Sequence, residues 1–462
     1  MTLIKSISGI RGTIGGLPGD SLTPLDVVRF TSAFGQQIRT LQKKDAYTVV
    51  IGRDARVSGE MVSMLVAGSL MGMGIDIIDL GFATTPTVEI GVTHYKADGG
   101  IILTASHNPG QWNALKLLNA KGEFISADEG AELLALAAGD KVEFAQVTQL
   151  GKLTRSDKMN DIHIDAVVKM KHVDAESIRK ARFKVVIDCV NSVGGIILPS
   201  LLKKLGVSEV IELFCTPTGI FPHNPEPLPQ HLGDISVAMV RHNADVGFVV
   251  DPDVDRLVIV NEDGSIFGEE YTLVAVADFV LSKQPGNTVS NLSSTRALED
   301  ITVKHGGFYT AAPVGEVNVV NEMKKTSAVI GGEGNGGIIY PELHYGRDAL
   351  VGIALFLTHL AQSQKKCSAL RKTYPDYFNS KNKIELKPSV DVDKLISAIR
   401  AKYKDHPVND RDGIRIDFDR EWVHLRKSNT EPIIRVISES TSAEKADALA
   451  SRMILEIHEL VD

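Results

Sequence analysis

Residues 47–80 read YTVVIGRDARVSGEMVSMLVAGSLMGMGIDIIDL, and this stretch indicates the class of fold. The apolar run at 47–51 predicts a strand, the amphipathic segment 58–73 predicts a helix, and the run at 75–80 predicts a second strand. Two strands joined by a helix are typical of a crossover between parallel strands. We therefore expect an α/β protein.

The alternation of strands and helices continues along most of the chain. The further predicted strands are residues 100–103, 183–188, 209–214, 245–250, 287–291 and 327–330. The helices predicted between them are residues 87–95, 193–205, 271–281 and 295–305. The last part differs, because closely spaced strands with flanking helices are typical of a small α+β domain. Its predicted strands are residues 413–418, 422–425 and 433–437, with helices near Leu395 and Ala443.

The length of 462 residues exceeds what one hydrophobic core usually holds. We expect three similar α/β domains followed by a C-terminal α+β domain. The predicted boundaries are 1–150, 151–262, 263–375 and 376–462. Linkers are predicted near residues 151–158, 261–268 and 374–383.

Composition and charge exclude several classes of protein. Hydrophobic residues make up 43% and charged residues 23%, as in a globular chain rather than a disordered one. Lys and Arg number 50 against 58 Asp and Glu, and there is no long basic run, so we expect no nucleic-acid partner. The three cysteines form no CxxC pair, which argues against a disulfide framework or a zinc site and favours a cytoplasmic protein. No run of about 18 apolar residues and no apolar N-terminal segment occurs, so we expect neither membrane insertion nor secretion.

The sequence TASHNP at 104–109 follows the predicted strand 100–103. This order places Ser106 at the carboxyl end of a strand, where α/β proteins usually bind ligands. A serine in that place can act as a nucleophile. The same six residues also suit an Asx-type turn, so the motif alone leaves both interpretations open.

A second motif, DPDVDR at 251–256, follows the predicted strand 245–250. Its three alternating carboxylates can converge on a hard cation such as Mg²⁺ or Ca²⁺. They belong to Asp251, Asp253 and Asp255. An EF-hand loop is an alternative, because Glu262 is the twelfth residue of such a loop, but Arg256 occupies the position that requires glycine. A solvated acidic turn is the other alternative.

A glycine-rich run, GGEGNGG at 331–337, follows the predicted strand 327–330. Its glycines permit close approach of the backbone, and Glu333 and Asn335 offer hydrogen-bond partners that suit sugar hydroxyls. The spacing differs from the G-x-G-x-x-G of dinucleotide-binding sites. On its own the run is also compatible with a simple turn.

The sequence RKSNTEP at 426–432 precedes the predicted strand 433–437. Arginine guanidinium groups, hydroxyls and backbone N–H groups in one turn can together bind a phosphate without a metal. The candidate phosphate ligands are Arg426, Ser428, Asn429, Thr430 and Arg435. A polar hairpin loop is the alternative interpretation.

In this order the four loops resemble the catalytic, metal-binding, sugar-binding and phosphate-binding loops of the α-D-phosphohexomutases, one in each domain and over essentially the whole chain. Three further segments are similar to the family: SGIRG at 8–12, TPTGIFPHNPEP at 216–227 and PVGE at 313–316. The resemblance implies four domains around a central cleft. It also implies an enzyme that interconverts hexose 6-phosphate and hexose 1-phosphate.

The resemblance further implies roles for individual residues. The implied catalytic residues are Ser106, Lys116, Arg11 and His107. The implied ligands of one Mg²⁺ per active site are Ser106, Asp251, Asp253 and Asp255. The implied substrate-binding residues are Arg256, Glu333, Asn335, Arg426, Ser428, Asn429, Thr430 and Arg435. Ser106 would carry a phosphate and exchange it with the sugar through a hexose 1,6-bisphosphate, which also serves as activator.

The chain departs from the family pattern at the end of the sugar loop. Many relatives have a histidine there that acts as general acid or base, whereas this chain has Gly337. Lys116 is then the first candidate for proton transfer, with His107 and His344 as alternatives.

The form of the glycine-rich loop resembles that of archaeal-type phosphoglucosamine mutases, which favours glucosamine 6-phosphate as substrate. Broad specificity for glucose, mannose and glucosamine phosphates is the alternative.

Two other functions are alternatives to a mutase. A metallophosphatase with a serine nucleophile would need no second phosphate site, and a sugar-phosphate sensor would not need Ser106 or Lys116. We expect a cytoplasmic monomer or homodimer whose partner is a small phosphosugar.

Overall fold

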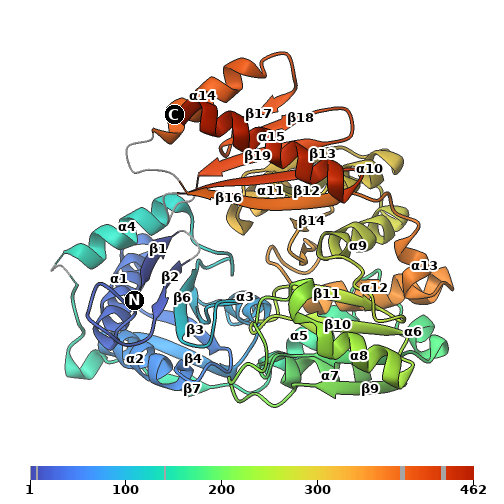
Figure 1. Ribbon diagram of the computed structural model, residues 1–462. Helices are drawn as coiled ribbons and strands as arrows, with labels where there is room; N and C mark the ends of the chain where they lie inside the picture. The colour runs from blue at the N-terminus through green and yellow to red at the C-terminus, as the bar shows by residue number, and fades with distance from the viewer. Residues whose placement is uncertain (1, 7–8, 140–141, 386–390, 428–432, 462) are drawn as a thin grey trace. The chain divides into compact units, whose positions relative to one another are not determined.

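The computed structural model describes residues 2–6, 9–139, 142–385, 391–427 and 433–461. The chain forms two compact units. The first consists of Met1–Thr272 with Asn335–Arg371, and the second of Leu273–Gly334 with Lys372–Asp462. Both units combine sheets with packed helices, as expected for an α/β chain (Figure 1).

A seven-stranded sheet forms the first part of the first unit. Its strands, in spatial order, are β1 (Leu3–Ser6), β2 (Gly9–Thr13), β6 (Trp112–Leu118), β5 (Gly99–Leu103), β3 (Tyr47–Arg53), β4 (Ile75–Phe82) and β7 (Leu153–Arg155). β3 is parallel to both β4 and β5, which confirms the predicted crossover. β7 pairs with β4 inside a segment that we predicted to be a linker.

Helices cover both faces of this sheet. Successive residues of a strand point to opposite faces, so neighbouring residues of one strand enter different cores. Val49 and Ile51 are buried in a core that includes side chains of three helices, whereas Val50 belongs to a separate core on the opposite face. The three helices are α1 (Pro24–Gln42), α2 (Gly59–Gly72) and α4 (Ala127–Ala138), and the opposite core includes α3 (Thr85–His94). The alternation explains why the consecutive residues Val49, Val50 and Ile51 are all apolar.

A four-stranded sheet forms the second part of the first unit. Its order is β11 (Leu257–Asn261), β10 (Val246–Val250), β8 (Lys184–Asp188) and β9 (Glu209–Leu213). Strand β10 is parallel to β8 and antiparallel to β11. The associated helices are α5 (Met159–Val168), α6 (Ala175–Ala181), α7 (Gly194–Leu205) and α8 (Gly233–His242).

The segment 335–371 also belongs to the first unit. It contains β15 (Gly337–Ile339), α12 (Ala349–Ser363) and α13 (Cys367–Arg371). Helix α12 packs against α5 and α6 and is buried along most of its length, as its apolar sequence requires. Helix α9 (Glu269–Lys283) begins in the first unit and ends in the second.

The second unit contains a parallel arrangement and an antiparallel sheet. In the first, β12 (Thr288–Asn291) lies between β13 (Tyr309–Ala312) and β14 (Ile330–Glu333), with α10 (Ala297–Lys304) and α11 (Glu316–Thr326). The antiparallel sheet has the order β16 (Phe378–Glu385), β20 (Ile433–Ser440), β19 (Trp422–Lys427), β18 (Ile414–Asp417) and β17 (Val408–Asn409). Its helices are α14 (Val392–Lys402) and α15 (Ala443–Val461), and α15 packs on β16 and β20 (Figure 1).

Strand β16 corrects the predicted linker at 374–383. It pairs with β20 from Phe378 to Glu385. The sequence FNSKNKIE is mostly polar because only Ser380 and Ile384 are buried, and it therefore lacks the apolar alternation on which the prediction depended.

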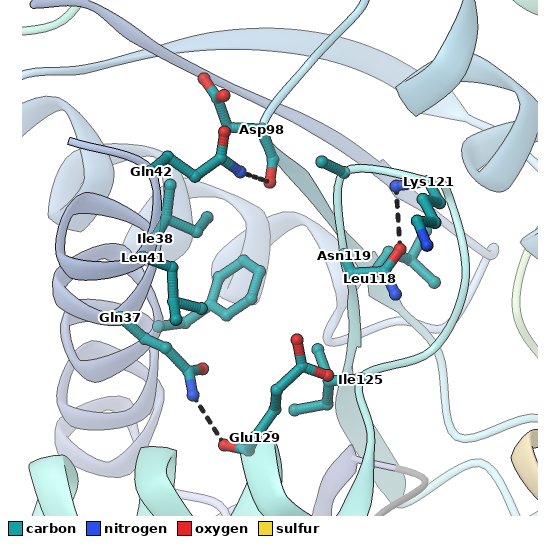
Figure 2. A pocket seen from close by; sticks show the side chains of 12 residues that line it. Gln37, Ile38, Leu41, Gln42, Asp98, Leu118, Asn119, Lys121, Ile125 and Glu129 are labelled. Carbon is teal, nitrogen blue, oxygen red and sulfur yellow. Dashed lines mark hydrogen bonds between the residues drawn. The ribbon is translucent and has the colours of Figure 1, made fainter. Parts of the chain in front are cut away.

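A pocket of about 270 Å³ lies between α1 and the segment 118–125 (Figure 2). Two of its polar side chains are bonded to backbone carbonyls: Gln42 Nε2 donates to the carbonyl of Asp98, and Gln37 Nε2 to that of Glu129. The lining does not include any of the site residues predicted above.

Among the helices of the described ranges, none combines the length and the apolar character needed to cross a membrane.

Candidate active site

The first two sequence motifs meet in the first unit. Ser106 follows β5 and Asp251 follows β10, so both lie at the carboxyl ends of strands with parallel neighbours. Ser106 Oγ donates a hydrogen bond of 2.8 Å to Asp251 Oδ2. The predicted nucleophile therefore lies directly beside the predicted metal ligands.

Protein donors hold at least one oxygen of each carboxylate in the triplet. Asp251 Oδ1 accepts the backbone N–H of Asp255 and of Arg256, at 3.2 and 3.1 Å. Lys116 Nζ and Thr85 Oγ1 both donate to Asp253 Oδ2 at 2.6 Å. Asp251 is therefore oriented by its own loop, whereas Asp253 is oriented by side chains of β6 and α3.

The third carboxylate is oriented in the same way. Asp255 Oδ2 accepts from Arg347 Nη2 at 2.7 Å and from Lys116 Nζ at 3.3 Å. Asp255, like Asp251 and Asp253, has an exposed fraction of 0%. All three carboxylates are thus fixed before any ligand binds.

The remaining oxygens fit a divalent cation. Asp253 Oδ1 and Asp255 Oδ1 are buried and have no hydrogen-bond partner within the described part of the chain. One ligand atom from each of Asp251, Asp253 and Asp255 can be chosen so that all three lie within 4.8 Å of one another. Buried carboxylate oxygens without partners are costly, and oxygen ligands are those that Mg²⁺ and Ca²⁺ prefer. The residues present therefore suit such an ion.

Burial and mutual repulsion act on these acids. Burial raises the pKa of Asp251 well above its usual value, and the charges of Asp255 and Asp253 raise it further. Burial also opposes the ionisation of Asp253, but the charge and hydrogen bond of Lys116 outweigh it and lower the pKa of Asp253. The same partners keep Lys116 protonated, because Asp253 and Asp255 raise its pKa against the effect of burial.

Three guanidinium groups lie close to the nucleophile. Burial lowers the pKa of Arg11, and the positive charges of Arg256 and Arg347 lower it further. Burial and the same three arginines hold the pKa of His107 well below its usual value, so its imidazole is neutral. These three arginines repel one another, and an anion such as a phosphate bound between them would stabilise their charges.

His107 and Glu226 complete this part of the site. His107 Nδ1 is 3.3 Å from Ser106 Oγ, and His107 Nε2 is 3.9 Å from Glu226 Oε1. Arg256 Nη1 is 3.7 Å from the same glutamate oxygen. The segment 216–227 therefore reaches His107, the residue next to the predicted nucleophile.

The predicted sugar-binding glutamate lies in the second unit. Glu333 Oε1 accepts from Asn291 Nδ2 at 2.9 Å and from the backbone N–H of Gly315 at 3.2 Å. The glycine-rich loop and the segment 313–316 are thus adjacent. Asn335 belongs to the first unit, where its Oδ1 accepts the N–H of Gly337 at 3.3 Å in a turn.

The predicted phosphate loop lies between β19 and β20. Arg426 and Arg435 are direct cross-strand partners, and Arg426 Nε is 3.0 Å from Asp412 Oδ1. Like charges directly opposite each other on neighbouring strands repel, which favours an anion beside them. The other candidate ligands, Ser428, Asn429 and Thr430, lie outside the described residues.

Arg347 and Thr85 are residues of the site that sequence reasoning missed. No motif marks either of them, because Arg347 lies in a loop before α12 and Thr85 begins α3. A Cβ atom placed on Gly337 would lie 2.4 Å from Arg347 Cδ. The side chain of Arg347 therefore fills the space that a side chain at position 337 would need.

His344 lies between two carboxylates. Its Nδ1 is 3.1 Å from Glu89 Oε2, and its Nε2 is 3.1 Å from Asp348 Oδ2. Burial disfavours its charge, but Asp348 and Glu89 outweigh burial and raise the pKa of His344 to about 10. Asp348 also accepts from His163 Nε2 at 2.8 Å, so His344 is part of a buried structural network.

Models of one family match the chain from end to end. They are the phosphoglucomutase/phosphomannomutase alpha/beta/alpha domains I, II and III, at residues 3–142, 161–264 and 268–377, and the C-terminal domain at 385–456. The agreement extends over all four sequence motifs.

Individual relatives agree with the family models. A phosphoglucomutase/phosphomannomutase from Thermococcus kodakarensis is 35% identical over 94% of this chain and 95% of its own length. A "Probable phosphoglucosamine mutase" from Methanopyrus kandleri is 30% identical over 97% and 96%. The crystal structure of a phosphoglucomutase/phosphomannomutase family protein from Burkholderia thailandensis has a TM-score of 0.84 and 28% identity, and covers 99% of this chain and 96% of that one. The chain therefore belongs to the phosphoglucomutase/phosphomannomutase family of the α-D-phosphohexomutase superfamily and is a phosphohexomutase.

Proposed function

We propose that this phosphohexomutase interconverts glucosamine 6-phosphate and glucosamine 1-phosphate, with Ser106 as the carrier of the phosphate. The observation that carries the proposal is the 2.8 Å hydrogen bond between Ser106 Oγ and Asp251 Oδ2. A nucleophile in contact with a buried acidic triplet suits phosphoryl transfer, whose developing charge needs a cation.

In the proposed cycle, phosphorylated Ser106 gives its phosphoryl group to the free hydroxyl of the substrate. The bond between phosphorus and Ser106 Oγ breaks, a bond to the sugar oxygen forms, and the sugar hydroxyl loses its proton. The product of this half-reaction is a hexose 1,6-bisphosphate. After the bisphosphate turns round, its other phosphate returns to Ser106, and the same bisphosphate in solution primes unphosphorylated enzyme.

Asp251, Asp253, Asp255 and Ser106 would hold one Mg²⁺. The ion would neutralise charge on the phosphoryl oxygens during transfer. Lys116 orients Asp253 and Asp255 through its two contacts, and as a protonated ammonium it adds positive charge beside the nucleophile. This role is electrostatic rather than that of a base.

The arginines and His107 would serve the transferring phosphate and the proton. Arg11 and Arg256 supply positive charge around the phosphate, and their mutual repulsion would be relieved when the phosphate is present. The neutral imidazole of His107, 3.3 Å from Ser106 Oγ, can accept a proton at Nδ1. We therefore favour His107 over Lys116 for proton transfer.

The glycine-rich loop and the phosphate loop would bind the rest of the substrate. Glu333 and Asn335 would accept hydrogen bonds from ring hydroxyls. The phosphate that is not being transferred would bind Arg426 and Arg435, together with Ser428, Asn429 and Thr430. Two guanidinium groups can bind one phosphate through several charge-assisted hydrogen bonds.

The choice of sugar rests on the relatives and on the glycine-rich loop. The relative from Methanopyrus kandleri is named for glucosamine phosphate, while the one from Thermococcus kodakarensis is named for glucose and mannose phosphates. Broad specificity is accordingly the second candidate.

We also propose the four domain boundaries given above, a cytoplasmic location and a monomeric or homodimeric state.

Intact-mass measurement of the purified protein, followed by peptide mapping, tests the carrier. We expect a mass increment of one phosphate on Ser106 after incubation with glucose 1,6-bisphosphate. Isomer formation is then measured with glucosamine, glucose and mannose 6-phosphates in parallel. Equal turnover of all three would favour the broad-specificity alternative, and release of inorganic phosphate in place of an isomer would contradict the proposed cycle.

A further inference from the structure

A buried arginine lies behind the catalytic serine and uses all its donors on the protein. Arg56 is 1% exposed and lies in the loop between β3 and α2. Its Nε donates to Asp54 Oδ2 at 3.0 Å, and its two terminal nitrogens each donate to two backbone carbonyls. The four carbonyl oxygens belong to Ser106, Asn108, Pro109 and Trp112. A guanidinium has five N–H groups, so none remains for a substrate.

Asp54 holds the same loop from the other side of the serine. Ser106 N–H donates to Thr104 Oγ1 at 2.9 Å, and Thr104 Oγ1 donates to Asp54 Oδ2 at 2.6 Å. The backbone N–H of Arg56 donates to Asp54 Oδ1 at 3.0 Å. The Asp54–Arg56 pair therefore binds the loop both before and after the side chain of Ser106.

The backbone of Ser106 needs such support. Its φ of +50° lies in the left-handed region, which a residue with a Cβ seldom adopts unless its surroundings impose it. This conformation sets the direction of the side chain, whose Oγ reaches Asp251. A relaxed loop would move Oγ away from the carboxylates.

We propose that the Asp54–Arg56 pair is a positioning device that holds Ser106 in its left-handed conformation and thereby aims its Oγ at the metal ligands. The proposal rests on the proposed function for the role of Ser106 but assigns the pair no contact with the phosphosugar. Because the pair acts only through the loop, its loss slows phosphoryl transfer and leaves substrate affinity nearly unchanged.

The substitution Arg56→Lys separates the shape of this side chain from its charge. Lysine keeps the positive charge but has three donors on one nitrogen, so it cannot reach four carbonyls and a carboxylate at once. We expect kcat to fall at least about 50-fold, since misplacement by about 1 Å can cost 100-fold, while KM stays within about 3-fold. Unchanged kcat, or a loss confined to KM, would overturn the proposal.

Arg53→Lys is the matched control. Arg53 ends β3 in the same segment, and its Nη1 donates to the backbone carbonyl of Asp54 at 3.3 Å. It does not contact the serine loop in the described structure. We expect kcat of this variant to remain within about 2-fold of wild type.

Hydrogen exchange of the backbone at residues 104–112 tests the pair without substrate, so its outcome does not depend on the proposed function. Exchange there should be at least about 10-fold faster in Arg56→Lys and unchanged in Arg53→Lys. If Arg56→Lys does not fold, Thr104→Val replaces it in the exchange measurement. This variant removes the hydroxyl that links Ser106 N–H to Asp54 and keeps Arg56. Wild-type exchange rates at 104–112 in the folded variant would overturn the proposal, whereas a wild-type enzyme that isomerises no hexose phosphate would contradict only the proposed function.

Discussion

Ser106 Oγ and Asp251 Oδ2 are 2.8 Å apart, although 145 residues separate them in the sequence. The hydrogen bond joins the ends of two sheets that are built from different parts of the chain. Phosphoryl transfer at Ser106 would therefore take place beside three carboxylates that the fold has already oriented.

Ser106→Ala should lower kcat for isomerisation at least about 1000-fold, because the variant has no atom to carry the phosphate. Mass spectrometry should find no phosphate on the variant after incubation with bisphosphate. Ser397→Ala, on an exposed part of α14, is the control and should behave as wild type. Turnover above about a tenth of wild type in Ser106→Ala would contradict the carrier role.

Asp255→Asn should weaken Mn²⁺ binding at least about 10-fold, because it replaces a charged ligand oxygen in the triplet. The measurement is a Mn²⁺ titration of the protein without substrate, followed by the EPR signal of the free ion. Asp263→Asn lies in an exposed turn and should leave the affinity unchanged. Equal affinities of wild type and Asp255→Asn would remove Asp255 from the metal site.

Gly337→Ala should displace Arg347 from Asp255, since the added Cβ would lie 2.4 Å from Arg347 Cδ. We expect kcat to fall about 10-fold, and to fall little further when the same change is made in an Arg347→Ala background. Gly130→Ala, where the added Cβ has no neighbour within 4 Å, is the control. Additive losses in the double variant would show that the two positions act independently.

Arg426→Ala should raise KM about 10-fold or more and lower kcat less, because it removes a phosphate contact that both substrate and transition state use. Arg400→Ala, on the exposed side of α14, should leave both constants near wild type. A fall in kcat with unchanged KM would argue against a phosphate site at Arg426.

His344→Gln should lower the melting temperature by about 3 to 5 °C at pH 6.5, because a buried ion pair loses one partner, at a cost of about 3 kcal/mol. The raised pKa of His344, about 10, means that its stabilisation is complete below its unfolded pKa near 6.5 and is lost as pH rises through 10. The two carboxylates that bind it, Glu89 and Asp348, and the neighbouring ring of His163 remain in the variant.

The difference in melting temperature between wild type and His344→Gln should therefore shrink between pH 7 and pH 10.5. Thermal unfolding followed by circular dichroism at several pH values measures it. His458→Gln, on the last turn of α15, is the control and should show no such trend. A constant difference over this range would contradict the ion-pair role of His344.

Local pattern determined much of this protein from sequence. The apolar runs within β3, β8 and β10 predict strands because burial on both faces of a parallel sheet favours consecutive apolar residues. Ser106 and the Asp triplet were found because each directly follows such a strand, and the order of four loops identified the family. Strand β16 was missed because its burial is sparse.

Only the tertiary structure determined which distant residues meet. Arg347 approaches Asp255 across 92 residues and Lys116 approaches Asp253 across 137, and no local pattern encodes either contact. The same holds for Arg56, which a reading of the sequence cannot distinguish from an exposed arginine. A side chain's hydrogen-bond partners depend on how strands and helices pack, so the sequence reveals the reactive groups, whereas the packed fold decides which donors orient them.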